Sequence, residues 1–362
     1  MNNMSSKKQY PGLYLLKSAA MFLVVILHLT GIGGAAYSPD ASRSTVILLS
    51  SFQFISYSCI NLFAMATGFI YYGRGRKLSK LLSLWFQVFF YSVMECIIFF
   101  LITRDLMSVK PYILGMIFPF SFKHYWYFSF YCVVFVFIPF LNTAVEKMSK
   151  GYLAGLIAFL LLVSNIGMIT NNDLLMIDNG YSPLWLIILY LIGACVKKYD
   201  LHEKRIPPVF VILSIGMMIA SVLIAFVFGN GDLPFNMSLF NYINLPIVCF
   251  SVLLFLLFFR IGKGKQCPKA LKMISASSFT VYLIHTHHIV FNNVIKGRFA
   301  WIGAKGVFPA LIYILLCALC IYIICTVLGL LQIYLFKLIK VDDISQKIAD
   351  KVKKIIKKSV KI

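Results

Sequence analysis

Two residues that can ionise, Lys17 and His28, interrupt the apolar stretch from Leu13 to Gly31. They are eleven positions apart. On an α-helix this is three turns plus about 20°, so both side chains lie on one face, about 16 Å apart along the axis. A histidine can act as a general base or carry an acyl group, and a cation can bind phosphate. Ionisable residues inside a membrane helix usually face a bundle interior or a wet cavity. The pair therefore predicts a functional site along this helix.

Each residue of the pair also has a structural interpretation. His28 could hydrogen-bond a neighbouring helix and so hold the two helices together. Lys17 lies near the start of the run and could extend its ammonium to the membrane surface. Finding both on one face favours the functional interpretation.

Other polar groups lie at the same depth in the membrane. Glu95 is a carboxylate well inside an apolar run, and it could orient the His28 imidazole or share a proton with it. His285 and His288 are three positions apart, so on a helix they would form a possible metal pair. No carboxylate or cysteine nearby completes a metal site. We therefore expect a polar lining of the same cavity and no metal.

Two clusters at the ends of apolar runs could bind substrates. The one at the expected outer surface could stack on a sugar, although an interfacial aromatic belt has the same composition. It consists of His124, Trp126 and Tyr127. The one at the expected inner surface could bind a phosphorylated cofactor, although membrane orientation alone also explains a basic cluster. It consists of Arg74, Arg76, Lys77 and Lys80.

The composition defines the class of protein. The chain has 362 residues, of which 60% are hydrophobic and 13% charged, about half the charged fraction of soluble domains. Ten apolar runs predict an all-α polytopic membrane protein with about ten transmembrane helices. The runs are 13–34, 47–72, 82–102, 125–142, 152–170, 183–196, 208–228, 239–259, 277–295 and 307–336.

The net charge of +22 is distributed in short clusters between the runs. This argues against nucleic-acid binding, which would need one basic patch. With both termini in the cytoplasm, the inner segments hold 26 of the 34 Lys and Arg residues, as the positive-inside rule requires. We expect one transmembrane domain over residues 1–336. Residues 337–362 form a basic cytoplasmic tail, either an amphipathic helix on the anionic inner leaflet or a solvated segment.

With these residues in place, the chain resembles the acyltransferase-3 family of bacterial integral-membrane acyltransferases. Lys17 and His28 match the family's first-helix signature of a basic residue, ten residues and a histidine, in which arginine is the commoner basic residue. Three further motifs agree in order along the chain. They are Asn61–Phe69, with Thr67 in place of serine, the Trp-Tyr-Phe run at 126–128 followed by Pro139, and Tyr-Leu-Ile-His ending at His285.

The resemblance implies transfer of an acetyl or succinyl group from cytoplasmic acyl-CoA to a hydroxyl of an exported or cell-surface polysaccharide, or of a lipid-linked glycan. His28 would be the general base or a transient acyl carrier, with Glu95 beside it. Lys17, Arg74, Arg76 and Lys77 would bind the donor, and His124, Trp126, Tyr127 and His285 the acceptor. The protein would lie in the bacterial cytoplasmic membrane in contact with its lipids, with a glycan synthase or export complex as its partner. A polysaccharide exporter and a non-catalytic partner of a glycan synthase are the alternatives.

Overall fold

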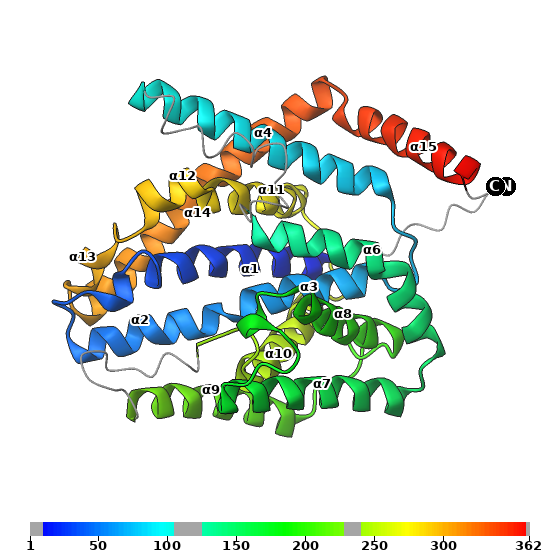
Figure 1. Cartoon of the computed structure of the whole chain (residues 1–362). Helices are drawn as coiled ribbons and strands as arrows, with labels where there is room; N and C mark the ends of the chain where they lie inside the picture. The colour runs from blue at the N-terminus through cyan, green and yellow to red at the C-terminus, as the bar shows by residue number, and fades with distance from the viewer. Residues whose placement is uncertain (1–9, 105–124, 228–239, 360–362) are drawn as a thin grey trace.

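The computed structural model describes residues 10–104, 125–227 and 240–359 of the chain. Within these ranges it consists of helices joined by short connections, and it contains no strand (Figure 1). The all-helical architecture predicted from the apolar runs is confirmed.

The helices follow one another along the chain with few long connections. The longer ones are α1 (Pro11–Thr30), α2 (Arg43–Ser56), α3 (Ser58–Tyr71), α4 (Leu78–Thr103), α6 (Trp126–Lys147), α7 (Lys150–Thr170), α8 (Pro183–Lys198), α9 (Pro208–Val227), α10 (Leu245–Ile261), α11 (Lys269–Thr286), α14 (Val307–Leu338) and α15 (Val341–Ser359). The short ones are η1 (Ala35–Tyr37), η2 (Asp178–Gly180), α12 (His288–Val290), η4 (Phe291–Ile295) and α13 (Ala300–Gly303).

Each of the ten predicted runs overlaps at least one of these helices. Among the described residues, seven helical stretches are long and apolar enough to cross a membrane, so the chain is a polytopic membrane protein. They are Pro11–Tyr37, Arg43–Tyr71, Leu78–Thr103, Trp126–Lys147, Lys150–Thr170, Pro208–Val227 and Val307–Leu338. The remaining three runs contain α8 and α10, of 16 and 17 residues, and α11, which is rich in Ser and Thr. A total of ten spans, with both termini in the cytoplasm, stays a prediction.

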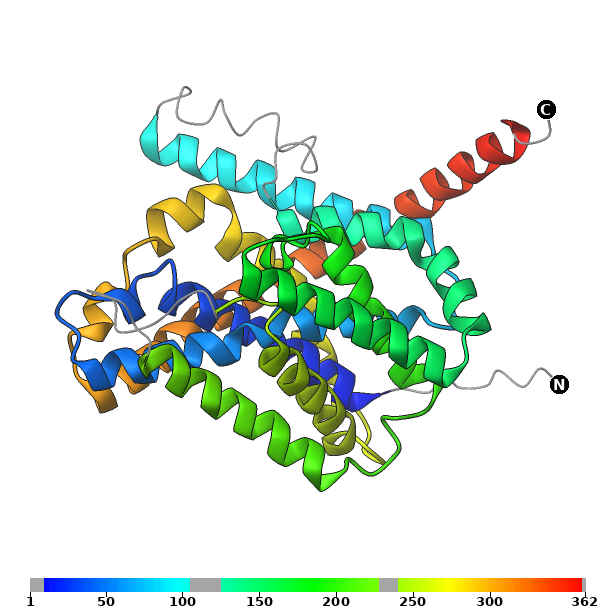
Figure 2. The same cartoon turned by 60° about the horizontal axis from the view of Figure 1, so that its bottom comes forward.

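Helix α1 runs through the middle of the bundle, and α7 and α9 lie at its edge (Figures 1 and 2). Helix α1 packs against α2, α3, α10, α11 and α14, and its Leu16, Ala20 and Leu29 are fully buried. The edge helices instead leave large apolar side chains such as Phe159 and Ile212 exposed. In a membrane protein such side chains face hydrocarbon, so exposure of this kind marks the perimeter.

Helices α3 and α8 cross at two glycines. A Cβ atom added at Gly193 would lie 1.9 Å from the carbonyl oxygen of Met65, and one at Gly68 would lie 2.1 Å from that of Tyr190. Small residues let membrane helices approach backbone to backbone. This close crossing fixes the position of α3, which forms one wall of the cavity described below.

The C-terminal segment is helical, as the periodicity of its isoleucines indicates. Helix α15 begins three residues after the end of α14 and packs along α4 (Figure 1). The Ser83 hydroxyl donates to Asp342 Oδ1 at 2.7 Å, and Val341, Ser345 and Ala349 are buried. Ile344, Ile348, Ile355 and Ile356 stay exposed beside these buried residues.

Candidate active site

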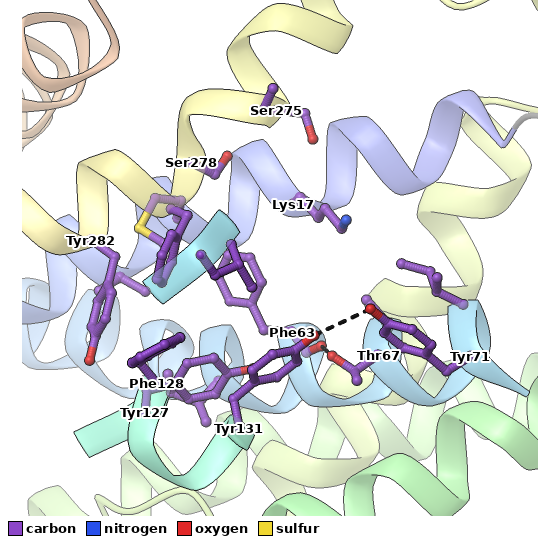
Figure 3. A pocket seen from close by; sticks show the side chains of 18 residues that line it. Lys17, Phe63, Thr67, Tyr71, Tyr127, Phe128, Tyr131, Ser275, Ser278 and Tyr282 are labelled. Carbon is purple, nitrogen blue, oxygen red and sulfur yellow. Dashed lines mark hydrogen bonds between the residues drawn. The ribbon is translucent and has the colours of Figure 1, made fainter. Parts of the chain in front are cut away.

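A cavity of about 370 Å³ opens between α1, α3, α6 and α11 (Figure 3). Apolar and aromatic side chains make up most of its wall, and hydroxyl groups and one lysine supply its polarity. Figure 3 shows Lys17 and Tyr71 at one end and Tyr282 with Tyr127 and Phe128 at the other. The lining residues are Lys17, Met21, Val24, Ile60, Phe63, Ala66, Thr67, Ile70, Tyr71, Leu84, Tyr127, Phe128, Tyr131, Ser275, Ala276, Ser278, Phe279 and Tyr282.

Helix α1 presents one face to this cavity. Lys17, Met21 and Val24 line the wall in succession, and His28 follows on the next turn of the same face. The shared face that the spacing predicts is therefore present. Within the described part of the chain, no hydrogen bond or ion pair joins the Lys17 ammonium to another residue. The cavity thus holds a cation available to a ligand.

The histidines of α1 and α11 meet beyond the Val24 and Tyr282 end of the cavity. His28 Nδ1 lies 3.0 Å from His285 Nε2, and His285 Nδ1 is hydrogen-bonded to the carbonyl oxygen of Val281. The ring of Phe291 stands edge-on to His28, with the centroids 5.3 Å apart. The partner of His28 thus comes from 257 residues further along the chain.

Glu95 has a different partner from the one considered above. Its Oε2 atom lies 2.6 Å from His287 Nδ1, and both side chains are buried, at 8% and 1% exposure. Glu95 therefore contacts the imidazole of His287 and not that of His28. Tyr125 lies beside this pair, its ring centroid 6.0 Å from that of His287.

The run that carries the three histidines is not one continuous helix. Helix α11 ends at Thr286, because His287 adopts an extended conformation with ψ of 136°, and α12 begins at His288. The break removes the helical spacing that would have placed His285 and His288 on one face. His285 is buried against His28, whereas His288 is exposed. Among the described residues, no three His, Cys, Asp or Glu side chains gather as a metal site would require.

The aromatic candidates separate into two environments. Tyr127 lines the cavity. Trp126 lies in a ring cluster with Tyr181 and Tyr242, at centroid distances of 4.7 and 6.2 Å. His124, the third member of this group, lies outside the described residues.

The basic candidates lie on the connection between α3 and α4, next to the Lys17 end of the cavity. Arg74 and Lys77 are exposed. Arg76 has a partner in the protein, because its Nη1 atom donates to the carbonyl oxygen of Phe135 at 2.9 Å. Pro139, four residues further along α6, has no N–H to give to that carbonyl. Arg76 thus replaces the missing helical hydrogen bond.

Several polar groups of the cavity were not singled out from the sequence. Ser275, Ser278 and Tyr282 line it from one face of α11, at the i, i+3 and i+7 positions of a helix. Tyr71 and Tyr131 face each other from α3 and α6, with hydroxyls 3.4 Å apart. The spacing of the α11 residues is a signal that a search for polar helix faces could have found. The tyrosine pair depends on the packing of two helices and leaves no such signal.

A second cavity, of about 410 Å³, lies where the start of α1 meets the end of α10. Its wall includes Tyr10, His202, Glu203 and Lys263, and Lys263 Nζ is 3.0 Å from Glu203 Oε2. Burial lowers the pKa of His202, and the charge of Lys197 lowers it further. This cavity contains none of the residues that the sequence singled out.

Together, these features define a polytopic helical membrane protein with a cavity inside the bundle and a pair of contacting histidines next to it. A family model described as an acyltransferase domain matches residues 10–330, which is most of the chain. The chain therefore belongs to the acyltransferase-3 family and is an acyltransferase. No curated protein and no solved structure matches it.

Proposed function

We propose that this protein transfers an acetyl or succinyl group from cytoplasmic acyl-CoA to a hydroxyl of an exported or cell-surface polysaccharide, or of a lipid-linked glycan. One observation carries the proposal. An apolar cavity has at one end a cation, Lys17, that no other described residue pairs, and it leads toward the histidine pair His28 and His285 at the other end.

The donor enters from the Lys17 end. Its phosphate groups bind Lys17 and the exposed Arg74 and Lys77 beside the cavity mouth, since cations bind phosphate through charge-assisted hydrogen bonds. The acyl arm lies along the apolar wall, in a volume typical of small-molecule sites. Arg76 has a structural role besides any contact with the donor, because it already donates a hydrogen bond to the carbonyl of Phe135.

The acyl group moves from the CoA sulfur to the acceptor oxygen next to His28. The acceptor hydroxyl gives its proton to His28 while its oxygen forms a bond to the acyl carbon. The bond from that carbon to the CoA sulfur breaks, and His28 returns the proton to the departing thiolate. A positioned general base contributes about 10²- to 10⁴-fold to the rate of such a step.

The acceptor approaches from the outer side of the bundle. Tyr127 at the cavity end and Trp126 in its ring cluster offer aromatic faces to a sugar, and His124 is close to both in the sequence. The acceptor would reach this side during export, which places the protein in the bacterial cytoplasmic membrane beside a glycan synthase or exporter. Its lipids contact the apolar perimeter, and anionic lipid faces the lysines of α15.

The experiment is NMR of purified surface polysaccharide from a deletion strain complemented with wild type, His28→Ala or His288→Ala. We expect normal polysaccharide without ester-linked acyl groups from His28→Ala, and full esterification from the exposed-histidine control. Polysaccharide trapped inside the cell would favour an exporter. Normal esters with His28→Ala would favour a non-catalytic partner of a synthase.

A further inference from the structure

We propose that His285 is a positioning residue that fixes the tautomer of His28, so that the Nε2 atom of His28 is the free base. The inference rests on the proposed function, because it concerns the base of that reaction. It follows from two hydrogen bonds that run in series, from the carbonyl of Val281 to His285 and from His285 to His28.

The first hydrogen bond determines the proton on His285. A carbonyl oxygen can only accept, so His285 Nδ1 carries the hydrogen in its bond to Val281. A neutral imidazole carries one ring proton, which leaves His285 Nε2 as an acceptor.

The burial of His285 supports its neutral form. The residue is 1% exposed, and a charge there would need a compensating partner. The carboxylate at this corner, Glu95, is in contact with His287 instead. A neutral His285 therefore offers its Nε2 lone pair to His28.

The second hydrogen bond then determines the proton on His28. Its Nδ1 atom, 3.0 Å from His285 Nε2, must carry the hydrogen. The lone pair of a neutral His28 is consequently on Nε2, at the opposite edge of the ring. Phe291 packs edge-on against the same ring and restricts its rotation. In the same way, a hydrogen-bond acceptor at one ring nitrogen of a catalytic imidazole fixes the tautomer and the orientation of the ring.

The decisive measurement is solid-state NMR of the full chain in lipid, labelled with ¹⁵N in the histidine rings. Ring nitrogen shifts distinguish the Nδ1–H tautomer from the Nε2–H tautomer, and the difference from a His28→Ala sample identifies the His28 signals. We expect Nδ1–H in the wild type and a mixture or the other tautomer in His285→Leu. An Nε2–H tautomer of His28 in the wild type would overturn the proposal, whether or not the protein proves to act on polysaccharide.

A second measurement separates positioning from a general loss of structure. With purified protein in lipid, release of the CoA thiol from acetyl-CoA, with water as the acceptor of the acetyl group, gives kcat and KM. We expect His285→Leu to lower kcat by about 10²- to 10⁴-fold with little change in KM. His285→Gln, whose amide oxygen can accept from His28, should recover much of that loss. Equal losses for both variants at unchanged unfolding temperature would contradict a positioning role.

Discussion

At the scale of single residues, the cavity lysine and the histidines differ in whether they contact a polar partner in the described part of the protein. His28 is in contact with His285, and Glu95 is in contact with His287. Lys17 forms no such contact within the described ranges. A cation without a partner in an apolar wall lowers stability unless a ligand binds it. Its presence is therefore better explained by function than by folding.

We expect Lys17→Met to raise the KM for acetyl-CoA by about 10- to 100-fold, because a hydrogen bond to a charged group is worth about 1.5–3 kcal/mol. Lys17→Arg should keep most of the affinity, since it preserves the charge. The unfolding temperature of Lys17→Met in detergent should equal or exceed that of the wild type. A KM that does not change in Lys17→Met would show that Lys17 does not bind the donor.

The positions of these residues were predictable from the sequence to different degrees. The common face of Lys17 and His28 follows from helix geometry alone, and it is present. The partners of His28 and Glu95 were not predictable, because both lie beyond position 284, at the broken end of α11. Which histidine meets which partner depends on the change of direction at His287, and no periodicity signals that break.

At the scale of elements, helix α6 depends for one hydrogen bond on a side chain from the connection between α3 and α4. Pro139 leaves the buried Phe135 carbonyl without its helical donor, and Arg76 supplies one. From the sequence, Arg76 belonged to a phosphate-binding cluster. The structure gives it a hydrogen bond within the protein as well.

We expect Arg76→Met to lower the free energy of unfolding by about 1–3 kcal/mol, because it leaves a buried acceptor unsatisfied. In a Pro139→Ala background the residue at 139 regains its N–H, so the same change at Arg76 should cost much less. Thermal and denaturant unfolding of the four proteins in detergent would measure the coupling. Equal costs in both backgrounds would show that the Phe135 hydrogen bond contributes nothing.

The crossing of α3 and α8 gives a second test on elements. We expect Gly193→Ala to destabilise the protein by about 1–3 kcal/mol or more, since its methyl would overlap the backbone of Met65. Donor turnover should also fall, because α3 carries Phe63 and Thr67 in the cavity wall. Gly216→Ala on α9 is the matched control, because nothing lies within 4 Å of its added Cβ. Unfolding temperature and acetyl-CoA turnover would be measured for both, and similar losses would contradict the role of the crossing.

At the scale of the whole molecule, the pattern of charge and polarity predicts more than any single motif. Helix α8, which is short, and helix α11, which is rich in Ser and Thr, are not among the helices long and apolar enough to span a membrane, and many of their residues are buried. Among the long apolar helices, α1 runs through the middle of the bundle, whereas α7 and α9 lie at its edge and are the most exposed. Apolar runs therefore predicted the elements well. Their arrangement around the cavity depends on contacts between distant helices, which one sequence does not contain.

The orientation of the molecule in the membrane follows from its basic residues and can be tested directly. The segments that we expect inside, both termini included, hold 26 of the 34 Lys and Arg residues, and one of them, between α10 and α11, contains Cys267. A membrane-impermeant maleimide should therefore label Cys267 only after the cells are permeabilised. In a Cys267→Ser background, Asn172→Cys, on the connection after α7, should be labelled in intact cells. Labelling of Cys267 from outside would reverse the orientation, and the Lys17 end of the cavity would then face away from cytoplasmic acyl-CoA.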